Sequence, residues 1–355
     1  MNEQILDQAG KVREGEELDA QVVTDYIKSV VPDVQGTARI KQFPGGASNL
    51  TYAVSFDNKE YILRRPPFGK KAKSAHDMGR EFRVMQKLKP VFPYVPGMVA
   101  FCQDESVLGC DFYVMEKLVG IIPRADMPKG VALTPEQTRK LCLNFFDRLI
   151  ELHSVDYNAA GLADLGKGEG YVVRQIEGWS KRYRDAKTDD VPDFENIMTW
   201  LHANMPEQVS VCVIHNDYRL DNVVLDPNDP TEIIGVLDWE MATLGDPLMD
   251  LGNTLAYWVE ANDPPAFQFL RRQPSHIPGM MTRDEIIQYY CDRMNLQADD
   301  FLFYQVYGVF RLGVILQQIY YRFYHGQTKD PRFSAFGKMV EILESQCRSL
   351  LGDRI

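Results

Sequence analysis

Apolar and polar residues follow two different periods along the chain, and the pattern of the first third is typical of strands. Residues 50–56 and 60–65 are short, mostly apolar runs separated by the turn residues Asp57 and Asn58, and residues 110–118 form a third run. Runs of this length, rich in β-branched and aromatic residues and bounded by turn residues, are typical of β-strands. We therefore predict a small antiparallel sheet in this part of the chain.

Two helices are predicted around this sheet. Asp19 is suited to cap a helix whose apolar residues recur at helical spacing, and Pro32 ends it. A second helix is expected to begin at about Asp77. The polar and acidic residues 1–17 are predicted to form a loosely held arm.

The second half of the chain has mainly helical periodicity. Thr134 is followed by a proline at the first helical position and by a glutamine that completes a capping box, which predicts a helix from there to about His153. Residues 157–210 are predicted to be helical with intervening loops. Asp246, also followed by proline, caps the predicted helix 248–259.

A predicted hairpin interrupts these helices. Residues 223–225 and 233–237 are apolar runs, and residues 226–230 between them have the composition of a turn. Pairing of the two runs brings the open ends of the hairpin together. Asn222, before the first strand, and Asp238, after the second, are therefore predicted to face each other.

The candidate chemistry lies at this hairpin mouth, where His215, Asp217 and Asn222 have the spacing H-x-D-x-x-x-x-N. Two oxygen ligands with a further carboxylate nearby suit Mg²⁺, which takes few protein ligands and fills its octahedron with water and phosphate oxygens. In protein kinases an Asp and an Asn at this spacing accept the proton of the acceptor hydroxyl and hold metal, and a later Asp binds the metals. Asp217, Asn222 and Asp238 match those roles in turn, which predicts phosphoryl transfer.

This segment resembles the aminoglycoside phosphotransferase family, the small-molecule branch of the protein-kinase-like fold. It is most similar to the kinase-like domain fused to some eukaryotic acyl-CoA dehydrogenases and to its free-standing bacterial relatives, over roughly residues 43–325. Protein kinases carry D-F-G and later A-P-E, whereas here Trp239 and Glu240 follow Asp238 and no A-P-E occurs. That departure favours a small-molecule acceptor over a protein.

The resemblance implies an α+β, bilobal protein-kinase-like fold with the active site between the lobes. Residues 1–118 would form a small N-terminal lobe with an antiparallel sheet, one main helix and the N-terminal arm. Residues 119–355 would form a larger, mostly helical C-terminal lobe that carries the catalytic loop, the metal site and the acceptor-binding helices.

The resemblance also implies an ATP site. Backbone groups at a glycine-bearing hairpin tip can approach phosphates closely, although a simple turn is the competing interpretation. The candidate phosphate-binding residues are Gly45, Gly46, Ser48 and Asn49. Glu116 and Leu118 lie in the expected lobe linker, residues 116–120, whose backbone groups would bind adenine.

Arg64 is expected to contact the phosphates, in place of the usual kinase lysine, with Glu81 as its ion-pair partner. Two competing interpretations remain: Glu81 lies on an exposed, charged helix face together with Arg80 and Arg83, or the strand register is shifted by one and Arg65 is the functional residue.

Asp217 and Arg219 are the predicted catalytic residues. Asp217 would orient and deprotonate the acceptor hydroxyl, and Arg219 lies where kinases that phosphorylate Ser or Thr carry a lysine touching the transferred phosphate. The predicted Mg²⁺ ligands are Asn222 and Asp238.

Three other residues near this motif are assigned structural roles. His215 is expected to orient the loop backbone, although a general-base role is the alternative. Asp250 is expected to anchor the catalytic loop, and His153 to lie at a helix end without a part in catalysis.

The acceptor is predicted to be a neutral or anionic hydroxylated small molecule, such as a hydroxyacyl compound, rather than an aminoglycoside. Polyamine sugars need nearby carboxylates because an uncompensated ammonium is costly to desolvate, and residues 301–329 contain no Asp or Glu. The candidate acceptor-binding residues there are Tyr307, Arg311 and Arg322, although core packing explains the aromatics equally well. A second set that could border the site, or simply form a structural helix face, is Tyr171, Arg174, Trp179 and Arg182.

Composition narrows the class of protein. The chain has 355 residues, 45% hydrophobic and 25% charged, which is typical of one large or two modest globular domains, and its net charge of −11 argues against nucleic acid as a partner. Its six cysteines form no C-x-x-C pair and lie mostly in apolar runs, as buried thiols in a reducing compartment do. The sequence shows neither a signal peptide nor a stretch of about 18 apolar residues, which predicts a cytoplasmic protein without a membrane partner.

Two other functions stay open. Arginine at position 64 is compatible with a pseudokinase, a nucleotide-binding or scaffold protein without turnover. The same carboxylates acting on water would make a hydrolase. The presence of Asp217, Asn222 and Asp238 together favours the kinase.

Overall fold

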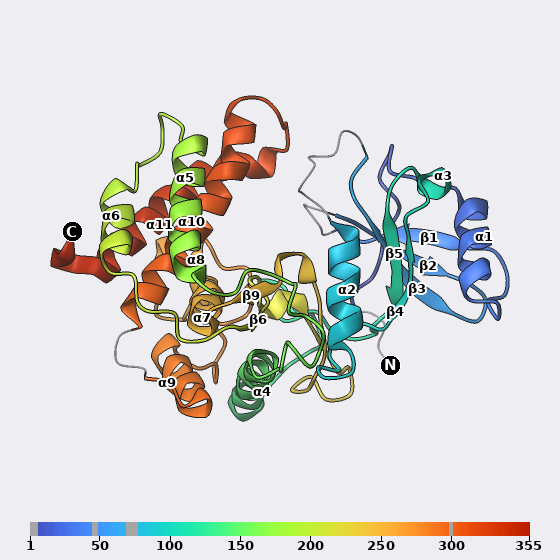
Figure 1. Cartoon of the computed structure of the whole chain (residues 1–355), viewed down its shortest axis with the longest axis horizontal. Coiled ribbons are helices and arrows are strands. Elements are labelled where there is room, and N and C mark those ends of the chain that lie inside the picture. Colours follow the sequence, from blue (N-terminus) through green and yellow to red (C-terminus); the bar gives the residue numbers. More distant parts are fainter. Residues whose placement is uncertain (1–5, 45–48, 69–76, 298–300) are drawn as a thin grey trace.

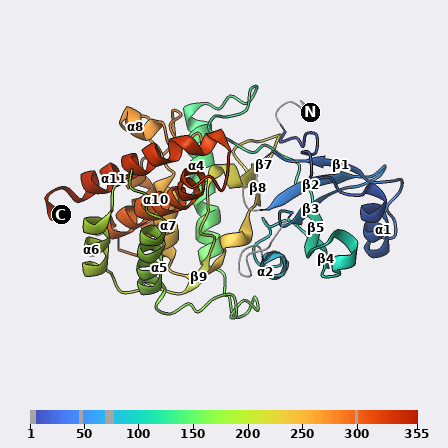
Figure 2. The same cartoon turned by 90° about the horizontal axis from the view of Figure 1, so that it is seen from above.

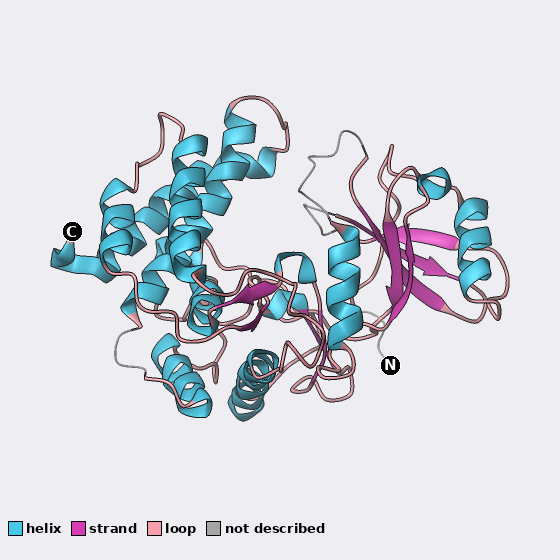
Figure 3. Ribbon diagram, in the orientation of Figure 1, coloured by secondary structure: helices cyan, strands magenta, loops and turns pink. Residues whose placement is uncertain are grey.

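The computed structural model describes residues 6–44, 49–68, 77–297 and 301–355, and these form two lobes (Figures 1 and 3). The N-terminal lobe contains an antiparallel sheet in the order β1-β2-β3-β5-β4. Its strands are β1 (Arg39–Gln42), β2 (Leu50–Ser55), β3 (Glu60–Arg65), β4 (Met98–Cys102) and β5 (Phe112–Glu116). The three strands expected from the sequence are thus confirmed, with β5 shorter at both ends than the predicted run.

The two faces of this sheet pack against different helices. α1 (Ala20–Val30) covers the outer face, where Val23 and Ile27 join the core formed by alternate residues of the strands, and the short α3 (Glu105–Leu108) lies beside it. α2 (Met78–Leu88) covers the other face, toward the C-terminal lobe (Figure 1). Asp19 caps α1 as predicted, and α2 begins at the expected position with Asp77 as its cap. Both side chains accept hydrogen bonds from backbone N–H groups of the first turn.

The N-terminal arm is more firmly held than its polar composition predicts. Gly10 and Gln42 exchange two backbone hydrogen bonds, at 2.8 and 3.0 Å, which add the arm to the edge of the sheet at β1. The hydroxyl of Tyr52 donates to the carbonyl of Glu16 at 2.8 Å. For residues 6–17 the expectation of a loose arm is therefore wrong, because backbone pairing makes no demand on apolar side chains.

The C-terminal lobe is mostly helical. Its helices are α4 (Pro135–His153), α5 (Tyr171–Ala186), α6 (Glu195–Ala203), α7 (Pro247–Ala256), α8 (Pro265–Gln268), α9 (Arg283–Met294), α10 (Leu302–Tyr324) and α11 (Phe336–Leu351), with short 3-10 turns at Leu220–Asn222, Trp239–Met241, Pro331–Ala335 and Gly352–Arg354. α10 packs against α7, α11 and α5, and Figure 2 shows α10 and α11 running side by side. The capping box at Thr134 and the Asp246 cap are confirmed, although α7 ends before the predicted position.

Two small antiparallel ladders lie between the sheet and the helices. β6 (Cys212–Ile214) pairs with β9 (Thr243–Gly245), and β7 (Val223–Leu225) pairs with β8 (Ile233–Val236) as the predicted hairpin. Ile121, just after the lobe linker, bonds to Leu225 through both backbone groups. The linker is thereby attached directly to the hairpin that carries the candidate site.

Two further sequence predictions can be compared with the structure. All six cysteines are buried and none is in a disulfide, as expected of structural thiols. Among the residues that the structure describes, every helix is too short or too polar to cross a lipid bilayer.

Candidate active site

A buried carboxylate fixes the loop between β6 and β7 by accepting hydrogen bonds from its backbone. Asp250, in the first turn of α7, accepts hydrogen bonds from the backbone N–H groups of His215 at 2.8 Å and Asn216 at 2.7 Å. Its carboxylate also lies 3.0 Å from Nε2 of His153 at the end of α4. Burial acts to raise the pKa of Asp250, but the interactions with His153 outweigh it and the pKa is lowered. An ionised Asp250 therefore fixes the start of the loop, and His153 contacts this carboxylate. The position of His153 in the sequence does not reveal this contact.

His215 organises the loop backbone. Its Nδ1 accepts a hydrogen bond from the backbone N–H of Asp217 at 3.2 Å, and its Nε2 lies 3.0 Å from the carbonyl of Leu237, to which it donates. Burial lowers the pKa of this imidazole, which favours the neutral tautomer that these contacts require. Both ring nitrogens are therefore occupied, which supports the predicted orienting role.

Asp217 and the two predicted Mg²⁺ ligands, Asn222 and Asp238, meet at the hairpin mouth. Nδ2 of Asn222 donates to a carboxylate oxygen of Asp217 at 2.9 Å. The backbone N–H of Leu237 donates to the carbonyl of Asn222 at 2.8 Å, and Asp238 is the residue after Leu237. Asp238 has φ of 68° and ψ of 62°, a left-handed conformation that is uncommon for residues other than glycine and is concentrated at functional sites.

Arg64 links Asp238 to the N-terminal lobe. Its Nη1 lies 2.9 Å from Glu81 and its Nη2 lies 3.1 Å from Asp238. The side chain of Glu81 is only 1% exposed, so the alternative in which Glu81 faces solvent is wrong. Burial by itself would lower the pKa of Arg64, but the neighbouring carboxylates raise it well above its usual value, so the guanidinium stays charged.

Arg65 faces the opposite side of the strand. Its guanidinium donates to the carbonyls of Pro66 at 3.1 Å and Leu108 at 3.3 Å and lies over the ring of Phe68. Arg64, and not Arg65, therefore faces the carboxylates of the site. The unshifted register is the one that the structure shows.

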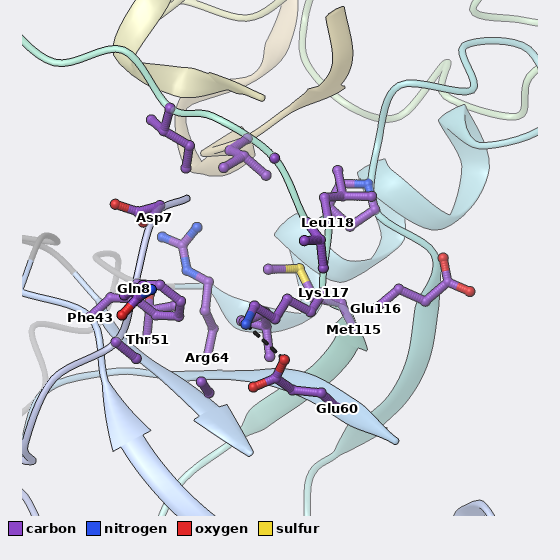
Figure 4. A pocket seen from close by; sticks show the side chains of 18 of the residues that line it. Asp7, Gln8, Phe43, Thr51, Glu60, Arg64, Met115, Glu116, Lys117 and Leu118 are labelled. Atoms are coloured by element: carbon purple, nitrogen blue, oxygen red, sulfur yellow. Dashed lines mark hydrogen bonds and ion pairs between the residues drawn. The ribbon is translucent and has the colours of Figure 1, made fainter. Parts of the chain in front are cut away.

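A cleft of about 590 Å³ lies between the lobes. The cleft is lined by Arg64 and Met115 from the sheet, by Glu116 and Leu118 from the linker, and by Asn222 and Asp238 from the hairpin. Figure 4 shows Arg64 together with the linker residues at this cleft. Of the predicted phosphate-binding loop, Gly45, Gly46 and Ser48 lie outside the described residues. Asn49 is buried, and its side-chain amide donates to Glu240 at 3.0 Å.

Arg219 lies against the predicted general base. Its Nη2 is 3.3 Å from Asp217, its Nε is 3.2 Å from Asp221, and its guanidinium lies 4.5 Å from the ring centre of Tyr257. Burial acts to lower the pKa of Arg219, but the two aspartates raise it. A permanent positive charge is therefore held beside Asp217.

Several residues that sequence reasoning missed connect distant segments to this site. Asp7 of the N-terminal arm lines the same cleft, as Figure 4 shows, and pairs with Arg124 of the C-terminal lobe at 3.0 Å. Arg80 in α2 donates to the backbone carbonyls of Glu240 and Ala242, beyond Asp238. No local pattern marks these contacts, because each joins residues far apart in the chain.

The structure does not bring the three candidate acceptor residues of α10 together. Tyr307 is fully buried, whereas Arg322 is exposed near the end of the helix. Arg311 is also buried, where it donates to the backbone carbonyl of Asn216 at 2.9 Å. Arg311 thus supports the catalytic loop from behind.

The family of this chain follows from its sequence match. Residues 39–285 match the model of the phosphotransferase enzyme family. The chain belongs to this family. It is 34% identical over 310 residues to acyl-CoA dehydrogenase family member 10 of Mus musculus, an alignment that covers 87% of this chain but only 29% of the mouse protein. The relationship inferred from the H-x-D-x-x-x-x-N segment is thereby confirmed.

Solved structures of other phosphotransferases share the fold of this family member. A protein of Ralstonia eutropha, provisionally named an aminoglycoside phosphotransferase, superposes with a TM-score of 0.78 at 28% identity, covering 94% of this chain and 99% of that one. A spectinomycin phosphotransferase in complex with ADP and spectinomycin has a TM-score of 0.57 at 15% identity over 92% of this chain and 97% of its own. The predicted bilobal, protein-kinase-like fold is confirmed.

Proposed function

We propose that this phosphotransferase transfers the γ-phosphate of ATP, bound with Mg²⁺, to a hydroxyl group of a small molecule. The observation that carries the proposal is the meeting of Asp217, Asn222 and Asp238 at the hairpin mouth, where Asn222 and Asp238 line the inter-lobe cleft. The ADP complex of the spectinomycin phosphotransferase, which has the same fold, supports the choice of an adenine nucleotide.

The donor set fits Mg²⁺. The amide nitrogen of Asn222 is engaged with Asp217, which leaves its carbonyl oxygen for a cation, and the side chain of Asp238 is 33% exposed at the cleft. Two oxygen donors leave room for phosphate oxygens in an octahedral shell. When bound, Mg²⁺ would neutralise charge on the phosphates and hold them in line for transfer.

The residues of the chain divide the remaining work. Asp217 accepts the proton of the acceptor hydroxyl while that oxygen forms a bond to the γ-phosphorus and the bond to the β,γ-bridging oxygen breaks, releasing ADP. Arg64 offers its charge to the phosphates. Arg219 offsets the negative charge near Asp217 and restricts the orientation of its carboxylate. Positioning and charge neutralisation supply most of the catalysis.

The acceptor in this proposal is a hydroxylated small molecule that is neutral or anionic, such as a hydroxyacyl compound, rather than an aminoglycoside. The absence of acidic residues from 301–329 supports this class, as does the similarity to a protein named for acyl-CoA dehydrogenation. That protein is much longer than this chain, so its name guides the choice of compounds to test and does not identify the acceptor.

Assay of ADP release tests the function directly. The purified protein would be incubated with ATP, with and without Mg²⁺, against a panel containing hydroxy acids, their thioesters, neutral polyols and kanamycin-like aminoglycosides. We expect ADP release that needs both Mg²⁺ and an acceptor from the first two groups. ADP release independent of any acceptor would indicate a hydrolase, and ATP binding without turnover across the panel would indicate a pseudokinase.

A further inference from the structure

A second cavity, of about 400 Å³, lies on the C-terminal-lobe side of the catalytic loop; we call it the α5 cavity. Its residues come from α5, from the loop before it, and from the two segments that flank the candidate active site. They are Lys167, Tyr171, Arg174, Gln175, Trp179, Arg182, Asn216, Met241, Thr243 and Leu244. Three of them carry positive charge and none is acidic, in a chain whose net charge is −11.

The cations of this cavity are not neutralised by any carboxylate in the part of the chain that the structure describes. Arg174 donates to the backbone carbonyls of Glu169 and Gly168, and Arg182 lies 4.5 Å from the ring centre of Trp179. Within the described part of the chain, Lys167, Arg174 and Arg182 form no ion pair with an acidic side chain. Arg174 and Arg182 are two helical turns apart on one face of α5, roughly 12 Å along the axis. Uncompensated charge of one sign in a concave site attracts a ligand of the opposite sign.

The cavity is joined to the catalytic loop by direct contacts. The hydroxyl of Tyr171 donates to Oδ1 of Asn216 at 3.0 Å, and Nδ2 of Asn216 donates to the carbonyl of Met241 at 3.1 Å. Asn216 immediately precedes Asp217. A molecule in the α5 cavity therefore lies against the backbone that positions the proposed general base.

Trp179 is the largest apolar side chain in the wall of the α5 cavity and is held by several contacts. The ring centre of Trp179 lies 4.5 Å from the guanidinium carbon of Arg182 and 5.1 Å from that of the buried Arg311. Its indole N–H donates to Gln175 at 3.0 Å. Trp179 and Met241 add apolar surface, so the cavity suits a ligand with an anionic end and an apolar section.

We propose that the α5 cavity binds an anionic group of the acceptor, so that the substrate carries a carboxylate or phosphate at a distance from the hydroxyl that is phosphorylated. This rests on the proposed function for the reaction, but the binding itself needs no turnover. Arg182 and Lys167 hold the anion, and Arg174 adds to the field. Guanidinium groups bind carboxylates and phosphates through charge-assisted hydrogen bonds.

Direct binding without nucleotide tests the inference. Calorimetry, supported by the change in intrinsic tryptophan fluorescence, to which Trp179 contributes, would compare hydroxyhexanoate with hexanediol, and glycerol phosphate with glycerol, at low and high salt. We expect at least one anion to bind about tenfold or more tightly than its neutral match, with a preference that weakens as salt rises. The two pairs distinguish a carboxylate from a phosphate preference.

Matched variants locate the binding. Arg182→Gln and Lys167→Gln are expected to abolish the anion preference, whereas Lys181→Gln retains it, because Lys181 is on the outer side of α5 and pairs with Asp185. Melting temperatures check that each variant is folded. Equal binding of anionic and neutral probes, no binding of either, or an unchanged preference in Arg182→Gln and Lys167→Gln would overturn the inference.

The outcomes separate the inference from the proposed function. If anions bind in a way that depends on Arg182 but no compound is phosphorylated, the cavity is an anion site and the proposed kinase function is wrong. If neutral acceptors are phosphorylated preferentially, and the rate does not change in Arg182→Gln or Lys167→Gln, the proposed kinase function stands and the assignment of the cavity is wrong.

Discussion

Arg64 takes the place of the lysine found in kinase strands, and its planar fork changes what that position can do. Its two terminal nitrogens reach Glu81 and Asp238 at the same time, at 2.9 and 3.1 Å. A lysine ammonium is a compact charge and lacks this fork geometry. Arg64 thus connects α2 with the proposed metal-binding aspartate, a role that fits an active site better than a degenerate one.

Replacement of Arg64 by alanine is expected to raise the Michaelis constant for ATP and to lower turnover. Loss of charge-assisted contacts to phosphate predicts roughly a 10- to 100-fold fall in kcat/KM. Arg65→Ala is the matched control, because Arg65 contacts Pro66, Leu108 and Phe68 on the other face of β3. ATP kinetics altered by Arg65→Ala and not by Arg64→Ala would show that Arg64 has been given the wrong role.

The two proposed metal ligands are expected to contribute unequally to the effect of Mg²⁺ on nucleotide binding. Asp238→Ala removes a carboxylate and should abolish the enhancement of nucleotide binding by Mg²⁺, whereas Asn222→Ala removes a neutral amide and should weaken the enhancement less. Nucleotide titrations with and without Mg²⁺ measure both. A full Mg²⁺ effect in Asp238→Ala would exclude Asp238 from the metal site.

Acidification is expected to destabilise the protein through Asp250. The pKa of this carboxyl is lower in the folded protein than its ordinary value, so its stabilising contribution is present above about pH 4 and is lost as the pH falls through the folded-state pKa. Asp250→Asn should lower the melting temperature at neutral pH and flatten its fall below about pH 4. Melting curves over this range provide the test, and an equally steep fall in the variant would count against this role.

At the scale of elements, the sequence was most informative where the signal is local. The cap at Asp19, the capping box at Thr134 and the β7–β8 hairpin all depend on residues a few positions apart, and all are present. α10 shows the opposite case. It is apolar on several sides, so its pattern does not reveal that Tyr307 and Arg311 are buried.

The close approach of α7 and α10 explains one glycine of α10. A Cβ atom added to Gly308 would lie 2.1 Å from the backbone carbonyl oxygen of Gly252. Gly308→Ala should therefore force the helices apart and destabilise the protein by about 1–3 kcal/mol or more.

Gly178→Ala is the control for this prediction. Its Cβ would meet only Arg182, at an ordinary 3.5 Å, so the better helix propensity of alanine should leave stability unchanged or slightly higher. Chemical denaturation measures both variants. Equal stability of Gly308→Ala and the wild type would contradict the close packing.

At the scale of the whole molecule, the two lobes were foreseen from the family resemblance, and we propose a boundary near residue 118, where the linker joins the β7–β8 hairpin through Ile121 and Leu225. The sequence predicts an N-terminal arm, but not its attachment to both lobes. Its attachment depends on the Gly10–Gln42 backbone pair and on the Asp7–Arg124 ion pair, neither of which an acidic, polar composition reveals. The α5 cavity likewise depends on helix packing, although the spacing of Arg174, Trp179 and Arg182 is compatible with one helical face.

The central claim is that Asp217 is the general base of a phosphoryl transfer in the cleft between these lobes. Turnover and Mg²⁺·ATP affinity of Asp217→Asn, measured beside the wild type with an acceptor found in the panel, test it most directly. We expect ATP affinity within a few-fold of the wild type and turnover lower by at least about 100-fold, the lower range for general-base catalysis. Near-normal turnover in the folded variant would contradict the assignment.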